Sequence, residues 1–202
     1  MRAARRTTKV VVMQSWSATA VFLDGFGRQP ELVEAALDGL SEDELAHQIA
    51  PDANTVAWLV WHTARMQDVQ IAGLAQALGR PEASGVTEQV WTAGGFREQF
   101  DLPLHSSDGR YGDMGYGDSP EQVAAVRAPA ELLTAYHGAV HQRTVDVIAS
   151  LVNEEYAAVV DEQWDPPVTA LVRLVSVLDD AAQHLGQAAF VRGVIERGRQ
   201  RA

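Results

Sequence analysis

The chain of 202 residues contains no cysteine, a single lysine and no long hydrophobic run. The lack of cysteine excludes disulfides, thiolate metal ligands and a cysteine nucleophile together. The lack of a long apolar run excludes a membrane-spanning helix, which needs about 20 consecutive apolar residues. No stretch alternates between apolar and polar residues over more than a few positions, so we expect no β-sheet. A glycine-rich phosphate loop between a strand and a helix is also missing.

The net charge of the chain is −11. This charge argues against non-specific nucleic-acid binding, which requires a basic surface. The basic residues cluster near the two ends of the chain (Arg2, Arg5, Arg6 and Lys9; Arg192, Arg197, Arg199 and Arg201). The middle of the chain is therefore more acidic than the total suggests, and we expect no nucleic-acid partner.

The N-terminal stretch carries basic residues before a short apolar run, Val10–Met13. This run is far shorter than the core of a secretory signal, and no small-residue cleavage site follows it. We therefore expect a cytoplasmic protein, without membrane association, that has a flexible basic tail over residues 1–16. The remaining residues, 17–202, are enough for one domain with a full hydrophobic core.

Apolar residues recur at helical spacing in four long segments, which cover residues 17–40, 55–78, 130–152 and 169–196. Gly25, Gly27 and Pro30 interrupt the first segment, which forms either one helix with an irregular middle or two short helices. Asn54 is a good N-cap for the second segment. Ser41–Glu44 has the form of a capping box and predicts a short helix there.

Residues 80–118 form a long connection that holds many of the glycines. We expect one short helix within it, near Gly95–Phe100, and another that begins at Ser119 and ends near Arg127. The aromatic residues of this connection favour a loop that packs over another part of the protein (Trp91, Phe96, Tyr111 and Tyr116). Four long helices with one extended crossover connection predict an all-α four-helix bundle.

Asp180 and His184 lie four residues apart in the last long helix, so their side chains share one face. His62 lies in the middle of the apolar stripe of the second long helix. If these helices face each other, two imidazoles and a carboxylate converge; such a set suits Zn²⁺, Ni²⁺ or Fe²⁺ and leaves open positions for water or substrate. The spacing equally permits partly buried histidines that hydrogen-bond to neighbours, with Asp180 protonated or paired with an arginine.

Two other arrangements of polar side chains are weaker candidates. His137 and His141 also lie four residues apart, but they have polar neighbours (Glu131, Gln142 and Arg143). We therefore interpret this pair as ordinary surface or boundary residues. Ser176 lies one turn before Asp180, but no strand–turn–helix elbow surrounds it, so the sequence does not support a hydrolytic triad.

The segments WLVWHTARMQD around His62 and VSVLDDAAQHLGQAAFVRG around His184 resemble the DinB/YfiT-like superfamily. The resemblance points to the branch that includes mycothiol-dependent enzymes such as maleylpyruvate isomerase. It implies a four-helix bundle in which His62, Asp180 and His184 bind a divalent metal. Two positions depart from the family pattern: Asp180 stands where Glu or His is common, and Gln187 stands where many relatives have a further His.

The resemblance also implies a chemistry, in which the metal coordinates the sulfur of a low-molecular-weight thiol and the thiolate attacks an electrophile. It therefore predicts a thiol-dependent transferase or isomerase whose partners are a small thiol and an electrophile. Arg65 and Arg192 are possible anchors for a carboxylate of either molecule, although for each one taken singly a solvated or paired arginine is the more common case. The tryptophans could form the walls of the pocket, although tryptophans at helical spacing more often belong to the core (Trp58, Trp61, Trp91 and Trp164).

Two alternatives stay open at this point. The same ligand set permits hydrolysis by metal-bound water. A non-catalytic, stress-associated or dimerising bundle with a vestigial metal site would account for the two departures, at Asp180 and Gln187. Members of the family often pair through their helices, so a homodimer is a further expectation.

Overall fold

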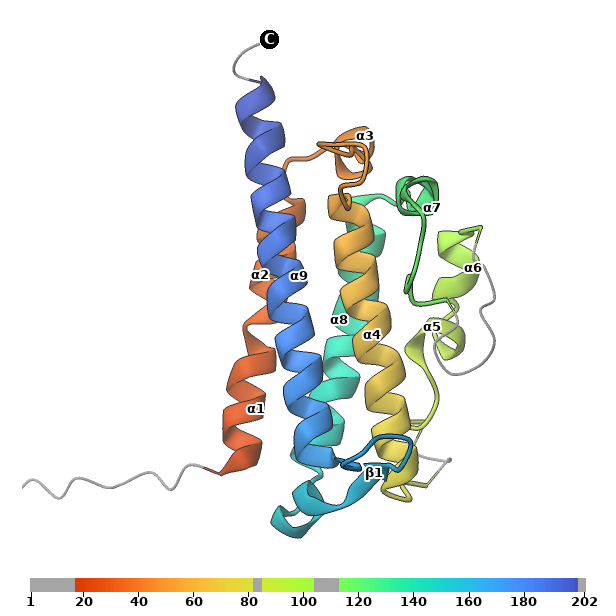
Figure 1. Cartoon of the computed structure of the whole chain (residues 1–202), viewed down its shortest axis with the longest axis vertical. Helices are drawn as coiled ribbons and strands as arrows, with labels where there is room; N and C mark the ends of the chain where they lie inside the picture. Colours follow the sequence, from red (N-terminus) through yellow and green to blue (C-terminus); the bar gives the residue numbers. More distant parts are fainter. Residues whose placement is uncertain (1–16, 82–84, 104–112, 200–202) are drawn as a thin grey trace, which may run out of the picture.

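The computed structural model describes residues 17–81, 85–103 and 113–199, which form a four-helix bundle (Figure 1). The long elements are α1 (Ala18–Gly27) continued by α2 (Gln29–Leu37), then α4 (Val56–Ala77), α8 (Ala130–Ala149) and α9 (Ala170–Arg199). α4 packs against both α8 and α9. α4 and α8 run in the same direction, and α9 runs opposite to both (Figure 1). The predicted all-α four-helix bundle is confirmed.

The first helical segment is divided into two helices at Arg28, which agrees with the second of the two expectations for this segment. Pro30 stands in the first turn of α2, where its missing N–H costs no hydrogen bond. Gly25 faces α9 so closely that a Cβ there would lie 2.9 Å from Leu178 Cδ2. A glycine at this position therefore lets α1 approach α9.

The short helices α3 (Glu42–Leu45) and α7 (Pro120–Ala125) both begin with a capping box, at Ser41 and Ser119. Both starts were predicted from the sequence. The predicted N-cap of α4 was wrong by one residue, because Thr55 Oγ1, and not Asn54, accepts the Trp58 N–H at 3.0 Å. Both residue types are good N-caps, and apolar periodicity does not separate adjacent positions.

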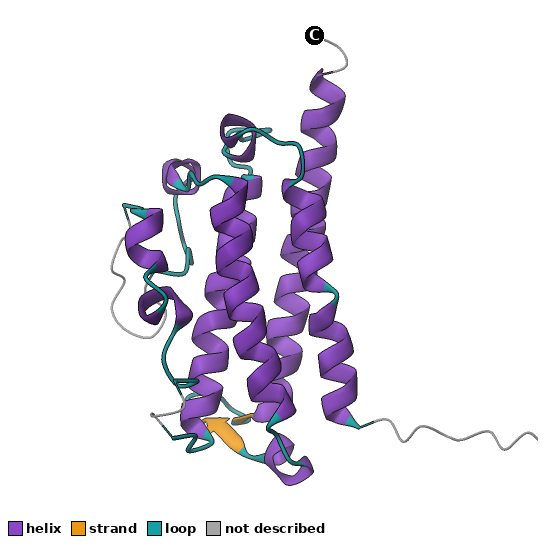
Figure 2. Ribbon diagram, turned by 180° about the vertical axis from the view of Figure 1, so that it is seen from behind, coloured by secondary structure: helices purple, strands orange, loops and turns teal. Residues whose placement is uncertain are grey.

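The crossover connection between α4 and α8 covers the outer side of α4 (Figures 1 and 2). It contains α6 (Phe96–Phe100), which matches the predicted short helix, and α5 (Val90–Ala93), which was not predicted. Trp91 is buried and contacts the ring of Tyr136 on α8 at a centroid distance of 5.2 Å. The expectation that the connection packs over another part of the protein is therefore confirmed at Trp91, whereas Tyr111 lies outside the described residues.

The expectation of no sheet was wrong in one place. After the 3₁₀ helix η2 (Asn153–Ala157), the strands β1 (Val159–Asp161) and β2 (Val168–Thr169) pair antiparallel. Strands of three and two residues are too short to show a repeating alternation in the sequence. None of the helices in the described ranges combines the length and the hydropathy that crossing a membrane requires.

The apolar core consists of two main clusters, one around Trp61 and Leu185 and one around Phe26 and Leu174. Three buried polar residues stand between them along the bundle, and we call these the polar layer (Gln29, Gln67 and Thr144). Gln67 Nε2 donates a hydrogen bond to Thr144 Oγ1 at 2.7 Å. Among the described residues, neither atom of the Gln29 amide has a hydrogen-bond partner. A buried amide in this state lowers stability.

We expect the substitution Gln29→Met to raise the free energy of unfolding by about 1 kcal/mol, because methionine fills a similar volume without a buried polar group. Urea unfolding measures this change. The exposed Gln76→Met serves as a control and should change stability by less than about 0.5 kcal/mol. A loss of stability in Gln29→Met would show that buried water satisfies the amide.

Candidate metal centre

His62 lies on the buried side of α4, where its imidazole is 2% exposed. The indole of Trp58, one turn earlier, stacks on it at a centroid distance of 4.5 Å. Asp180 and His184 face it from α9, and possible ligand atoms of the three side chains all lie within 4.8 Å of one another. Two helices that pack together therefore bring two imidazoles and one carboxylate to a single point.

Each imidazole has an acceptor at Nδ1, so Nε2 is the nitrogen that a metal would use. His62 Nδ1 bonds to the backbone carbonyl of Met114 in the crossover connection. His184 Nδ1 lies 3.2 Å from Gln187 Oε1, and its Nε2 lies 3.5 Å from Asp180 Oδ1. Acceptors at Nδ1 of this kind fix the tautomer and the ring orientation of metal-binding histidines. Gln187, which departs from the family pattern, thus orients a candidate ligand here.

The two histidines differ in their affinity for protons. Burial lowers the pKa of His62, and the nearby His184 lowers it further, against the opposing effect of the hydrogen bond to Met114. The hydrogen bond to Asp180 raises the pKa of His184, against its partial burial. Without a metal, the lowered pKa favours a neutral His62, whereas the raised pKa lets His184 keep its proton to a higher pH.

The donor set fits a divalent ion. Two imidazole nitrogens and one carboxylate oxygen suit Zn²⁺, Ni²⁺ or Fe²⁺. Three protein ligands leave coordination positions open, which is the arrangement of catalytic sites rather than structural ones. The side chains of Asp180 and His184 are 24% and 20% exposed, so the open side of the site faces away from the core.

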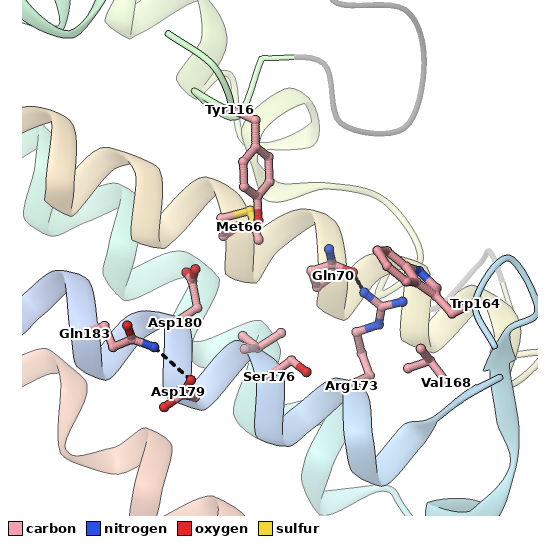
Figure 3. A pocket seen from close by; sticks show the side chains of 11 residues that line it. Met66, Gln70, Tyr116, Trp164, Val168, Arg173, Ser176, Asp179, Asp180 and Gln183 are labelled. Carbon is pink, nitrogen blue, oxygen red and sulfur yellow. Dashed lines mark hydrogen bonds between the residues drawn. The ribbon is translucent and has the colours of Figure 1, made fainter. Parts of the chain in front are cut away.

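A cavity of about 700 Å³ begins at Asp180 and extends along α9 (Figure 3). Met66, Tyr116 and Val168 give it apolar walls. At the end away from Asp180, Arg173 donates hydrogen bonds to Gln70 Oε1 at 2.5 Å and to Asp161 Oδ2 at 2.7 Å. A molecule bound in this cavity would have one end beside the His62–Asp180–His184 set.

The four tryptophans considered as pocket walls lie in three different environments. Trp164 lines the cavity and is 60% exposed. Trp58 supports the ring of His62. Trp61 and Trp91 are buried in the core and contact each other edge to face.

Arg65 lies inside the protein, where its side chain is 2% exposed. Its Nε donates to the Asp113 carbonyl at 3.0 Å, and Nη2 donates to Gln89 Oε1 at 3.1 Å. Nη1 lies 3.1 Å from the Tyr136 hydroxyl and 3.3 Å from Asp68 Oδ2. A substrate carboxylate could bind Arg65 only by displacing these partners, so the structure gives this residue a role within the protein.

Arg192, the other predicted anchor, lies on α9 beyond His184. Its Nε donates to Glu196 Oε1 at 3.1 Å, and its side chain is 21% exposed. It is not among the residues that line the cavity beside Asp180.

The interpretation of His137 as a surface or boundary residue was wrong. His137 is 1% exposed, whereas His141 is half-buried, and their rings stack at 6.2 Å. The polar neighbours in sequence point to other sides of α8 and do not report the environment of His137.

Within the described ranges, His62, Asp180 and His184 form the one group of three or more potential ligands. The Ser176 hydroxyl donates to the Val172 carbonyl at 2.9 Å, so it is not poised by a histidine.

Comparison with known proteins shows the family of the chain. The sequence profile of the DinB superfamily matches residues 26–188. A crystal structure of a conserved protein from Enterococcus faecalis is similar, with a TM-score of 0.74 and 31% sequence identity. The similarity covers 88% of this chain and 96% of that protein. A search of curated proteins found no match.

Burial lowers the pKa of His137 from 6.5 to about 4, which predicts a loss of stability in acid. Between these values the unfolded state binds more protons than the folded state, so the free energy of unfolding falls as the pH falls. From pH 7 to pH 5, His137 should contribute a loss of about 2 kcal/mol. Urea unfolding at both pH values, with a chelator present, should show this loss reduced in His137→Leu. An equal loss in both proteins would contradict the prediction.

Proposed function

The chain belongs to the DinB superfamily, and on this basis we propose that His62, Asp180 and His184 bind one divalent metal ion. The observation that carries the proposal is the orientation of the two imidazoles. Each has its Nδ1 occupied, by Met114 or by Gln187, so that Nε2 is the nitrogen left for a metal. Chance neighbours in a bundle have no reason to share this arrangement.

We propose further that the protein is a thiol-dependent transferase or isomerase. A bound divalent ion supplies Lewis acidity, which lowers the pKa of a coordinated thiol. The chain contains no cysteine, so the sulfur comes from a low-molecular-weight thiol of the mycothiol type. The cavity beside Asp180 has a volume typical of small-molecule sites and gives the thiol and its electrophile a place next to the metal ligands.

The residues of this chain have separate tasks in such a reaction. His62, Asp180 and His184 hold the ion, and the carboxylate offsets part of its charge. Met114 and Gln187 keep the two imidazoles in position. The apolar walls at Met66 and Tyr116 offer contacts to the carbon parts of the bound molecules.

Each of two alternatives has an observation in its favour. The exposed side of Asp180 and His184 admits water, which favours metal-dependent hydrolysis. The 3.5 Å contact between His184 Nε2 and Asp180 Oδ1 satisfies both groups without a metal, which favours a non-catalytic bundle with a vestigial site.

Metal analysis of protein purified without a histidine tag tests the site. We expect near-stoichiometric divalent metal in the natural protein and a loss of most of it in His62→Ala and in His184→Ala, because each change removes one of three ligands. His47→Ala changes an exposed histidine outside the site and should leave the metal content unchanged. Equal metal content in all four proteins would refute the assignment.

A thiol-transfer assay with chloro-dinitrobenzene as the electrophile tests the reaction. We expect turnover that requires a low-molecular-weight thiol such as mycothiol and that a chelator abolishes. Turnover of an ester substrate without thiol would support the hydrolase instead. Stoichiometric metal binding with no turnover in either assay would support the non-catalytic alternative.

A further inference from the structure

Residues 113–118, at the end of the crossover connection, lie along one stripe of α4, and we call this segment the strap. Arg65 Nε donates to the Asp113 carbonyl at 3.0 Å. The next carbonyl, that of Met114, accepts from His62 Nδ1. Arg65 and His62 are three residues apart, so they stand on the same face of the helix. The carbonyl that orients His62 is therefore adjacent in the chain to the one that Arg65 holds.

Trp58 lies on the same face of α4, one turn before His62. Its Nε1 donates to Asp118 Oδ2 at 2.9 Å, which fixes the other end of the strap. Gly115 passes directly over this indole, with a φ of +89° that favours glycine. A Cβ on Gly115 would lie 2.9 Å from Trp58 Cζ2 and 3.1 Å from Trp61 Cζ3. Both rings are buried, so the strap would have to move outward to accept a side chain.

Arg65 can hold the strap because it is itself fixed. Its guanidinium lies 3.3 Å from Asp68 Oδ2 and 3.1 Å from the Tyr136 hydroxyl, and both groups are buried. A guanidinium with planar, directional donors keeps its geometry better than an ammonium group on a flexible chain. Arg65 therefore fixes the position of the Asp113–Met114 backbone relative to α4.

We infer that Arg65 and Gly115 are positioning residues for the metal ligand His62, and that they act through the Met114 carbonyl. The inference rests on the proposed metal site and assigns to the strap the task of presenting His62 Nε2 toward Asp180 and His184. Moving the Met114 carbonyl away from His62 Nδ1 weakens the preference of this imidazole for the tautomer with a proton on Nδ1. The fraction of protein with Nε2 free to bind a metal then falls.

Zn²⁺ affinity, measured by competition with a chromophoric chelator, tests the inference. We expect Arg65→Lys and Gly115→Ala each to weaken Zn²⁺ binding at least about tenfold, the range found for groups that orient metal ligands. The two variants disturb the strap from different sides, so either one tests the inference if the other fails to fold.

A matched control separates positioning from general loss of stability. Gly117 also has a positive φ, +75°, but a Cβ there meets no atom of the described protein within 4 Å. Gly117→Ala should destabilise the protein yet keep Zn²⁺ affinity within about threefold of the natural value. A loss of affinity in this control as large as in the test variants would overturn the inference, as would unchanged affinity in both test variants.

The tautomer of His62 gives a readout that does not depend on metal. Nitrogen chemical shifts of the metal-free protein should show the proton on Nδ1 in the natural chain and in Gly117→Ala, and a mixture of tautomers in Gly115→Ala. Failure of the natural protein to bind Zn²⁺ would refute the proposed function alone. An unchanged His62 tautomer in Gly115→Ala would refute the role of the strap.

Discussion

A buried carboxylate on α4, Asp68, holds the crossover connection against the bundle. It accepts the backbone N–H groups of Val90 at 2.7 Å and Trp91 at 2.8 Å, and the hydroxyl of Tyr136 at 3.0 Å. Burial raises the pKa of Asp68, so the charged form depends on these donors and on the neighbouring Arg65 to persist. A buried charge without such partners would cost several kcal/mol. The start of α5 and the position of Arg65 both follow from satisfying this one group.

The crossover is long because α4 and α8 run in the same direction, so the chain must return along the full bundle before α8 begins. The crossover connection supplies a hydrogen-bond acceptor for His62 that α4 and α9 do not. α4 and α9 place His62, Asp180 and His184, but the acceptor for His62 Nδ1 lies outside both helices. This acceptor is the backbone carbonyl of Met114. The topology of the bundle and the chemistry of the site are thus linked through one backbone atom.

Sequence reasoning reached the bundle and the three candidate ligands, because helical spacing and side-chain type are local properties. It missed the features that depend on distant contacts. Two of the partners of Arg65 lie 48 and 71 residues away, at Asp113 and Tyr136, so the sequence could not show that this arginine is paired within the protein. The support of His62 comes from a backbone carbonyl, which has no side-chain signature. His137 was misplaced for a related reason: the burial of a helix face depends on which helices cover it, and sequence neighbours report the other faces.

The two imidazoles of the candidate site are unequal, and the inequality has a structural cause. His62 comes from the most buried helix and takes its acceptor from the strap, so desolvation lowers its pKa and keeps it neutral. His184 borders the open side and shares a hydrogen bond with Asp180 that raises its pKa. A cation bound here would therefore compete with a proton mainly at His184, whereas His62 would offer it a neutral imidazole.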